Sequence, residues 1–172
     1  MIGDLKALRI TAACQWECVA RKPGNVNRNH DYSDSTLNDF LISASLVGPI
    51  LSTAGTRGVG AAIYSACAET RARVGTNTNL GLVLALAPLA AVPDGKPLRD
   101  GVGRVLANLD RDDSKWAFQG IATANPGGLG ASAEQDVHSR RAGIDRDVEI
   151  SVFVEIAKRG RGYSVGERSW RI

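Results

Sequence analysis

The sequence of 172 residues has few cysteines and histidines, and this scarcity limits the sites it can build. It contains three cysteines, an odd number, and Cys14 and Cys18 lie one helical turn apart, so it offers no disulfide framework. The two histidines, His30 and His138, lie far apart along the chain. We therefore do not expect a zinc site.

Export signals and long apolar segments are also missing. The first six residues lack the basic and apolar leader and the small-residue cleavage site of a secreted protein. The longest nearly apolar run, residues 80–92, has 13 residues, which is too short to cross a bilayer and suits a buried helix. We therefore expect a cytoplasmic protein that has no membrane partner.

Most of the chain lacks an excess of either positive or negative charge. Residues 1–137 carry 13 Lys+Arg and 13 Asp+Glu, whereas residues 138–172 carry 8 and 5. The whole net charge of +3 therefore belongs to the C-terminal tail. That tail holds one RGRGY segment without repeats, which makes nucleic acid a weak candidate partner.

The hydrophobic pattern up to residue 137 is helical, and no strand-like alternation interrupts it. It predicts an all-α bundle of about six helices joined by loops rich in Gly, Asn and Pro. These helices are expected near residues 5–21, 35–48, 59–74, 80–92, 97–109 and 112–124. The first carries an apolar stripe at helical spacing: Leu5, Leu8, Ala12, Trp16 and Val19.

Three later helices carry further signals. Ser35 suits the N-cap of the second helix, which Gly48–Pro49 should kink or end. The fourth is apolar all round, which indicates burial. The residues of the fifth that we expect to face inward are Leu98, Val102, Val105, Leu106 and Leu109.

After Val137 the pattern changes. Residues 147–156 alternate between apolar and mostly polar residues with the period of a strand, and the remainder is basic and aperiodic. A single strand has no partner in a helical body. The segment is therefore either a hairpin or flexible tail, or a piece that does not belong to the preceding fold. We divide the chain into a helical domain, residues 1–137, and an atypical tail, residues 138–172.

Three loops place glycine and polar residues at helix boundaries: residues 21–34, 75–79 and 125–130. The backbone amides that start the predicted helix at Leu80 are unpaired and carry partial positive charge, which attracts phosphate or carboxylate. Thr76, Asn77 and Asn79 stand directly before these amides. Such residues are commonly caps, but one cap would suffice, so the second asparagine favours a binding role.

The first loop adds charged candidates. Lys22 precedes a Pro-Gly turn, which is also a common way to end a helix, and Asn25 adds a donor and an acceptor. Glu17 has apolar neighbours one turn away on the predicted helix, so its carboxylate needs either a function or an ion pair with Arg21 at i+4. Asp31 and Asp34 either hold magnesium on a polyphosphate or cap the next helix.

Several motifs in a fixed order resemble the triphosphoribosyl-dephospho-CoA synthases. They are KPGNV, FLISASLVGP, RGVGAAI, GTNTNLGLVLALAPLA and NPGGLG followed by EQDV, and the resemblance covers roughly residues 5–137. The chain is similar to a variant group with NTNLG where other members read NTHKG. The resemblance implies an all-helical fold and an enzyme that transfers the triphosphoribosyl group of ATP to the 2′-hydroxyl of 3′-dephospho-CoA, releasing adenine.

The resemblance also implies partners and roles. The substrates are ATP, with Mg²⁺, and 3′-dephospho-CoA, and the product supplies the prosthetic group of acyl carrier subunits of citrate lyase or malonate decarboxylase. Glu17 becomes the candidate catalytic carboxylate, since cleaving the bond between ribose and adenine creates an oxocarbenium-like centre. Lys22, Asn25, Thr76, Asn77 and Asn79 become candidate substrate ligands, and Asp31 and Asp34 candidate magnesium ligands.

Members of this family run beyond 172 residues, with further helices after EQDV. We therefore interpret the tail as the product of a truncation or frame shift, which leaves apolar surface that favours instability, homo-oligomers or loss of activity. The alternative function is a non-catalytic module that binds a nucleotide, CoA or a partner. A related transferase in another cofactor pathway is a further alternative.

Overall fold

The computed structural model describes residues 4–22 and 25–126, and within these ranges the chain forms seven α-helices and no β-strand. This confirms the predicted all-α class. The helices are α1 (Leu5–Val19), α2 (Leu37–Ser52), α3 (Ala54–Arg57), α4 (Val59–Val74), α5 (Leu80–Ala90), α6 (Leu98–Ala107) and α7 (Arg111–Ala124).

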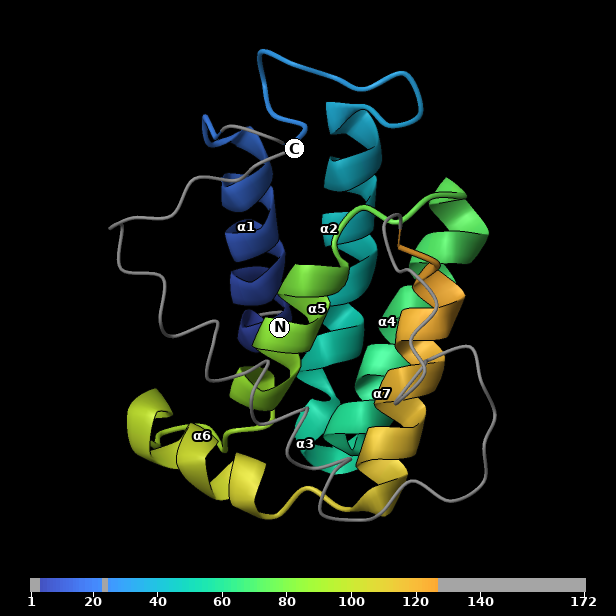
Figure 1. The fold of residues 1–172 in the computed structure, drawn as a ribbon. Coiled ribbons are helices and arrows are strands. Elements are labelled where there is room, and N and C mark those ends of the chain that lie inside the picture. Colours follow the sequence, from blue (N-terminus) through green and yellow to red (C-terminus); the bar gives the residue numbers. More distant parts are fainter. Residues whose placement is uncertain (1–3, 23–24, 127–172) are drawn as a thin grey trace, which may run out of the picture.

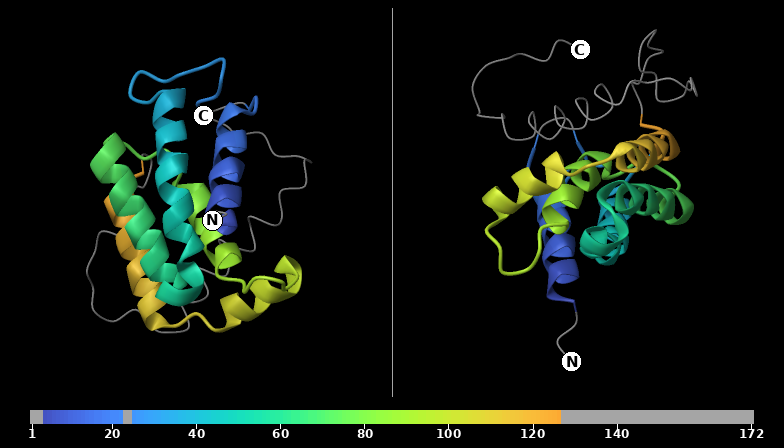
Figure 2. Two further views of the ribbon diagram at one scale, coloured as in Figure 1. Left: turned by 180° about the vertical axis from the view of Figure 1, so that it is seen from behind. Right: turned by 90° about the horizontal axis from the view of Figure 1, so that it is seen from below.

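The long helices form a bundle with two distinct ends (Figure 1). α1 and α2 are antiparallel neighbours, and α2 packs on α4, which runs in the same direction as α7. The views in Figure 2 agree that α3 and α6 lie at one end. The α1–α2 loop, the α4–α5 turn and the last residues of α7 lie at the other end, which we call the loop end.

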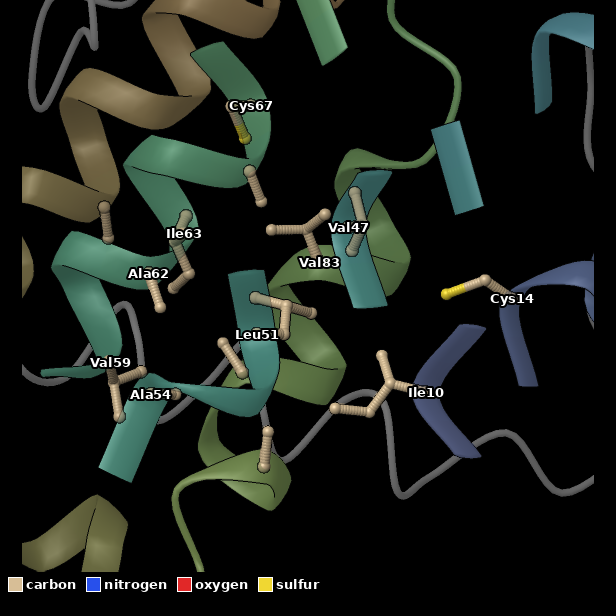
Figure 3. Close-up of a cluster of buried hydrophobic side chains, with 14 of the residues drawn as sticks. Ile10, Cys14, Val47, Leu51, Ala54, Val59, Ala62, Ile63, Cys67 and Val83 are labelled. Carbon is tan, nitrogen blue, oxygen red and sulfur yellow. The ribbon is translucent and has the colours of Figure 1, made fainter. Parts of the chain in front are cut away.

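The core is built from small and branched apolar side chains. Figure 3 shows Val47 and Leu51 of α2, Ile63 of α4 and Val83 of α5 gathered in one cluster, and all four are fully buried. Cys14 of α1 reaches this cluster from the far side. Because Val83 lies in the first turn of α5, this packing fixes where that helix begins.

Glycine allows α4 and α7 to approach closely. A Cβ on Gly60 would lie 2.1 Å from the carbonyl oxygen of Asp113, and one on Gly120 would lie 3.2 Å from the Cα of Tyr64. The Asp113 carboxylate also accepts a hydrogen bond of 2.8 Å from the Gly60 amide. The RGVGAAI motif therefore has a packing role at the start of α4.

The observed helices differ from the expected ones in three details. α4 has the predicted bounds, but the short helix α3 was not expected. α2 begins after Thr36, so Ser35 is not its N-cap; Thr36 and Asp39 form a capping box there. α2 also continues through Pro49 to Ser52, so the proline does not end the helix.

Apolar exposure also differs from the pattern. The α1 stripe faces outward, with Trp16 74% and Leu8 64% exposed, whereas Ile10, Cys14 and Cys18 face the core. Leu98 of α6 is exposed, contrary to expectation. α5 buries one face only; its partly exposed leucines are Leu80, Leu82, Leu84, Leu86 and Leu89. An apolar composition all round therefore did not produce complete burial.

None of the helices in the described ranges is long and apolar enough to cross a membrane. The predicted strand at residues 147–156, the tail and most of the NPGGLG and EQDV motifs lie outside the described residues. The boundary at residue 137 therefore stays a prediction.

Candidate functional site

The described parts of the three predicted loops lie at the loop end of the bundle (Figure 1). The α1–α2 loop covers the end of α1, the α4–α5 turn leads into α5, and Asn125 follows α7 in a left-handed conformation. Segments about 50 residues apart in sequence therefore lie at the same end of the bundle. This arrangement agrees with a site built from several loops on a helical scaffold.

Glu17 and Lys22 form an ion pair at the end of α1. Lys22 Nζ lies 2.5 Å from Glu17 Oε1 and donates a second bond of 2.6 Å to the Glu17 carbonyl oxygen. The side chains are 21% exposed for Lys22 and 37% for Glu17. The observed partner of Glu17 is thus Lys22 rather than Arg21. The carboxylate lies at the edge of solvent and not against a closed apolar surface.

Two thiols lie beneath this ion pair. Burial, together with the negative charge of Glu17 nearby, raises the pKa of Cys14 and of Cys18 to about 11. Both thiols are therefore protonated at neutral pH. They are poor nucleophiles there.

Asn25 lies in a loop that Asn27 organises. Asn25 Oδ1 accepts a bond of 2.8 Å from the Val26 amide. Asn27 is buried, donates from Nδ2 to the carbonyl oxygens of Lys22 and Asn25, and accepts from the Asn29 amide. Sequence reasoning missed Asn27, whose role depends on backbone groups that the pattern does not reveal. A pocket of about 400 Å³ opens beside it, lined by Arg21, Lys22, Asn27, Asn29 and His30.

Asp31 and Asp34 lie on the exposed approach to α2. Asp31 Oδ1 accepts a bond of 2.7 Å from the amide of Leu37, the first residue of α2, so the capping interpretation is confirmed for this carboxylate. Asp34 Oδ1 accepts a bond of 3.3 Å from Ser35 Oγ. The described ranges contain no group of three or more His, Cys, Asp or Glu side chains that could hold a metal ion.

The α4–α5 turn is held in place by several contacts. Gly75 ends α4 in a left-handed conformation with φ of 82°. Thr78 Oγ1 donates a buried bond of 2.6 Å to Ser43 Oγ of α2. Asn77 Oδ1 accepts a bond of 3.3 Å from the Leu80 amide, so Asn77 caps α5. The turn is therefore fixed without help from the second asparagine.

Asn79 is that second asparagine, and it makes no side-chain cap for α5. It is 7% exposed, and its Nδ2 has no hydrogen-bond partner among residues 4–22 and 25–126. It lines a narrow crevice with two other predicted residues, Thr76 and Asn77. Sequence reasoning missed two polar residues of α4 that line the same crevice, Thr70 and Arg71. Both lie within a predicted helix, and nothing in the sequence pattern indicates that they line a crevice.

The opposite end holds a larger pocket. Its volume is about 420 Å³, and it lies between α3, α6 and the starts of α4 and α7. Lys96 and Arg104 contribute positive charge, while Val59, Val105 and Leu109 contribute apolar wall. None of the predicted site residues lines this pocket.

Comparisons with known proteins identify the family. The family model of the ATP:dephospho-CoA triphosphoribosyl transferases (CitG) matches residues 6–162. Searches of the curated proteins and of the solved structures gave no match. The matched range includes most of the segment that the sequence analysis set apart as a tail. Because the match covers most of the chain, this protein belongs to the ATP:dephospho-CoA triphosphoribosyl transferase family.

Proposed function

We propose that this protein transfers the triphosphoribosyl group of ATP to the 2′-hydroxyl of 3′-dephospho-CoA and releases adenine. The family supports this reaction in general terms. The observation that carries the proposal for this chain is that a paired carboxylate and lysine lie at the same end of the bundle as the N-terminus of α5. These are the groups that a cationic sugar centre and a triphosphate require.

Glu17 is the proposed catalytic residue. The reaction breaks the bond between ribose C1′ and the adenine nitrogen and forms a bond between C1′ and the 2′-oxygen of the acceptor. The acceptor hydroxyl loses a proton and the departing adenine takes one up. A carboxylate near C1′ stabilises the positive charge that develops there, and Glu17 is partly exposed and paired with Lys22, which lines the pocket.

Lys22 is the lysine that we propose binds the triphosphate. In the structure it is paired with Glu17. A triphosphate carries more negative charge than one carboxylate and competes for Lys22, which leaves Glu17 open to the ribose. Asn25 adds a polar group to the same loop. Thr76, Asn77, Asn79 and the amides at the start of α5 bind phosphate oxygens in this proposal.

Asp31 and Asp34 suit a magnesium ion that arrives with ATP. Mg²⁺ prefers oxygen ligands and is commonly held by one or two carboxylates together with substrate phosphates. Both carboxylates are exposed, and each observed bond uses only one of the two carboxylate oxygens. When bound, the ion would offset the charge of the triphosphate, which a body with balanced charge does not do by itself.

The test is release of adenine from ATP, followed by chromatography, with and without dephospho-CoA. We expect release that depends on the acceptor and falls strongly in Glu17→Gln and Lys22→Ala. Asp94→Asn is the matched control, because it breaks another carboxylate–lysine pair, the one with Lys6 at the opposite end of the bundle. Unchanged release in both loop-end variants would show that the scheme is wrong.

The product and location are narrower proposals. We propose that the product supplies the prosthetic group of the acyl carrier subunit of citrate lyase or malonate decarboxylase, and that the protein acts in the cytoplasm. Replacing dephospho-CoA by other nucleotide acceptors in the assay tests the acceptor. Genes for either enzyme beside the coding sequence would support the pathway, and their absence would favour another cofactor.

We also propose self-association through the outer face of α1. The spacing of its stripe is symmetric about Ala12, so an antiparallel second copy would set Leu5 against Val19, Leu8 against Trp16 and Ala12 against itself. One helix of 15 residues offers less area than a standard interface, so we expect a weak dimer. Trp16→Glu should lower the mass measured by light scattering at high concentration; an unchanged mass would refute this interface.

A further inference from the structure

Two buried polar side chains in the crevice at the start of α5 have no partner. Thr70 is 4% exposed and Asn79 is 7% exposed, and neither Thr70 Oγ1 nor Asn79 Nδ2 forms a hydrogen bond with any residue that the structure describes. They come from different elements, the last turns of α4 and the residue before α5, yet they line the same crevice. Unpaired buried groups are costly and rare, so two in one place require an explanation.

The crevice itself bears on the simplest explanation, a bound water molecule. It is narrow in this structure and leaves no space the size of a water molecule, so a water that bonded to these groups would also have to move the lining side chains. Four of the residues that line it are accessible to solvent. Arg71 is exposed, and Thr76, Asn77 and Leu80 are half-buried. A ligand that moves these side chains apart would reach both unpaired groups.

The surrounding charges indicate what kind of ligand fits. The crevice lies at the N-terminus of α5, an 11-residue helix whose dipole gives this end partial positive charge. Arg71 adds a guanidinium, which pairs well with phosphate oxygens. Asn79 Nδ2 is a donor, and a threonine hydroxyl can donate as well. All of these groups favour an anion with several oxygens, and none of the crevice-lining side chains is acidic.

We infer that Thr70 and Arg71 of α4, together with Asn79, bind the phosphate chain of a substrate in this crevice. Thr70 and Arg71 thereby extend the candidate site beyond the α4–α5 turn. The inference rests on the proposed function for the identity of the substrate, because both ATP and dephospho-CoA carry phosphates. It does not depend on the chemical step, since binding of a phosphate chain is measurable without turnover.

The test uses the full chain and inorganic tripolyphosphate, measured by calorimetry. We expect Thr70→Val and Arg71→Ala each to weaken tripolyphosphate binding about tenfold or more. Arg73→Ala is the matched control: Arg73 is exposed on the same helix and is paired with Glu69, away from the crevice lining. Unchanged binding in the two crevice variants, or no binding by the unmodified chain, would overturn the inference.

Two further measurements separate this inference from the proposed function. Thr70→Val should not lower the thermal midpoint of the free protein, because it removes a hydroxyl that has no partner. This distinguishes lost binding from lost folding. ATP and dephospho-CoA are then titrated separately into the variants. The substrate whose affinity falls is the one whose phosphate chain binds in the crevice. If the variants lose phosphate binding while the unmodified chain releases no adenine, the proposed function fails and the inference stands.

Discussion

The Glu17–Lys22 pair and the Thr70–Asn79 crevice lie at the same end of the bundle, but their polar groups are in opposite states. Lys22 makes two short contacts with Glu17, and Asn27 bonds to the backbone around it. In the crevice, a hydroxyl and an amide are buried without partners. A paired cluster stabilises the free protein by itself, whereas an unpaired one reaches its lowest energy only with a ligand.

This contrast gives each region a different relation between stability and activity. Changes to the paired cluster should lower activity and slightly lower stability. Changes to the unpaired crevice should lower binding while stability stays the same or rises, which is the usual sign of a site kept for function.

The largest effect is expected from exchanging the charges of the paired cluster. Glu17→Lys combined with Lys22→Glu restores an ion pair but moves the carboxylate. We expect adenine release to fall about 10²–10⁴-fold, the range typical of a lost catalytic proton-transfer or carboxylate group. The unfolding free energy should change by only about 1 kcal/mol, since the pair is partly exposed. Recovery of activity in the double variant would show that Glu17 has only a structural role.

A second prediction compares one substitution at two buried threonines. Thr78 donates to Ser43 Oγ, so Thr78→Val should lower the unfolding free energy by about 1–2 kcal/mol. Thr70 has no partner, so Thr70→Val should leave it unchanged or raise it by up to about 1 kcal/mol. Urea denaturation of both variants measures the difference. Equal losses at the two positions would contradict the contrast between paired and unpaired groups.

The positions of the helices were largely predictable from periodicity, but the face that each helix turns toward the core was not. The bounds of α4 follow from a pattern that Gly58 and Gly75 delimit. α1 has apolar residues on two faces, and periodicity alone does not decide which face the rest of the chain covers. The core received Ile10, Cys14 and Cys18 because Gly48 of α2 allows close approach there; a Cβ on it would meet Thr11 at 1.9 Å.

The candidate site was predictable where it lies in loops. Glu17 and Lys22 were both identified, but the ion pair with Lys22 requires the chain to turn back after α1 ends at Val19, which an i,i+4 rule for helices does not describe. Thr70 and Arg71 belong to a helix and lie several residues before the turn. Only the packing of α4 beside the start of α5 brings them to the crevice.

A third prediction separates the two asparagines before α5. Asn77 caps the helix through the Leu80 amide, so Asn77→Ala should lower the unfolding free energy by about 1 kcal/mol. Asn79 makes no such bond, and Asn79→Ala should have a smaller effect on stability but a larger effect on tripolyphosphate affinity. Denaturation and calorimetry on the same samples give both values. A larger loss of stability for Asn79→Ala than for Asn77→Ala would show that Asn79, and not Asn77, caps α5.

The smallest effects are expected in the reactivity of the buried thiols. Cys67 lines the crevice and Cys18 lies beneath the ion pair. Burial raises the pKa of Cys67 to about 12, and burial followed by the charge of Glu17 raises that of Cys18 to about 11. Both should react slowly with a disulfide reagent at pH 8. Variants that keep a single cysteine, with the other two replaced by alanine, allow each rate to be measured separately.

The same thiols predict how stability depends on pH. Each has a folded-state pKa above the unfolded value of 9.0, so from about pH 9 to about 11 for Cys14 and Cys18, and to about 12 for Cys67, the unfolded chain binds fewer protons and stability falls as pH rises. Below pH 9 the thiols make no difference to stability.

If phosphate occupies the crevice, tripolyphosphate should slow the labelling of Cys67 and leave that of Cys18 unchanged. Equal slowing at both cysteines would indicate a general tightening of the bundle and remove the distinction between the two regions.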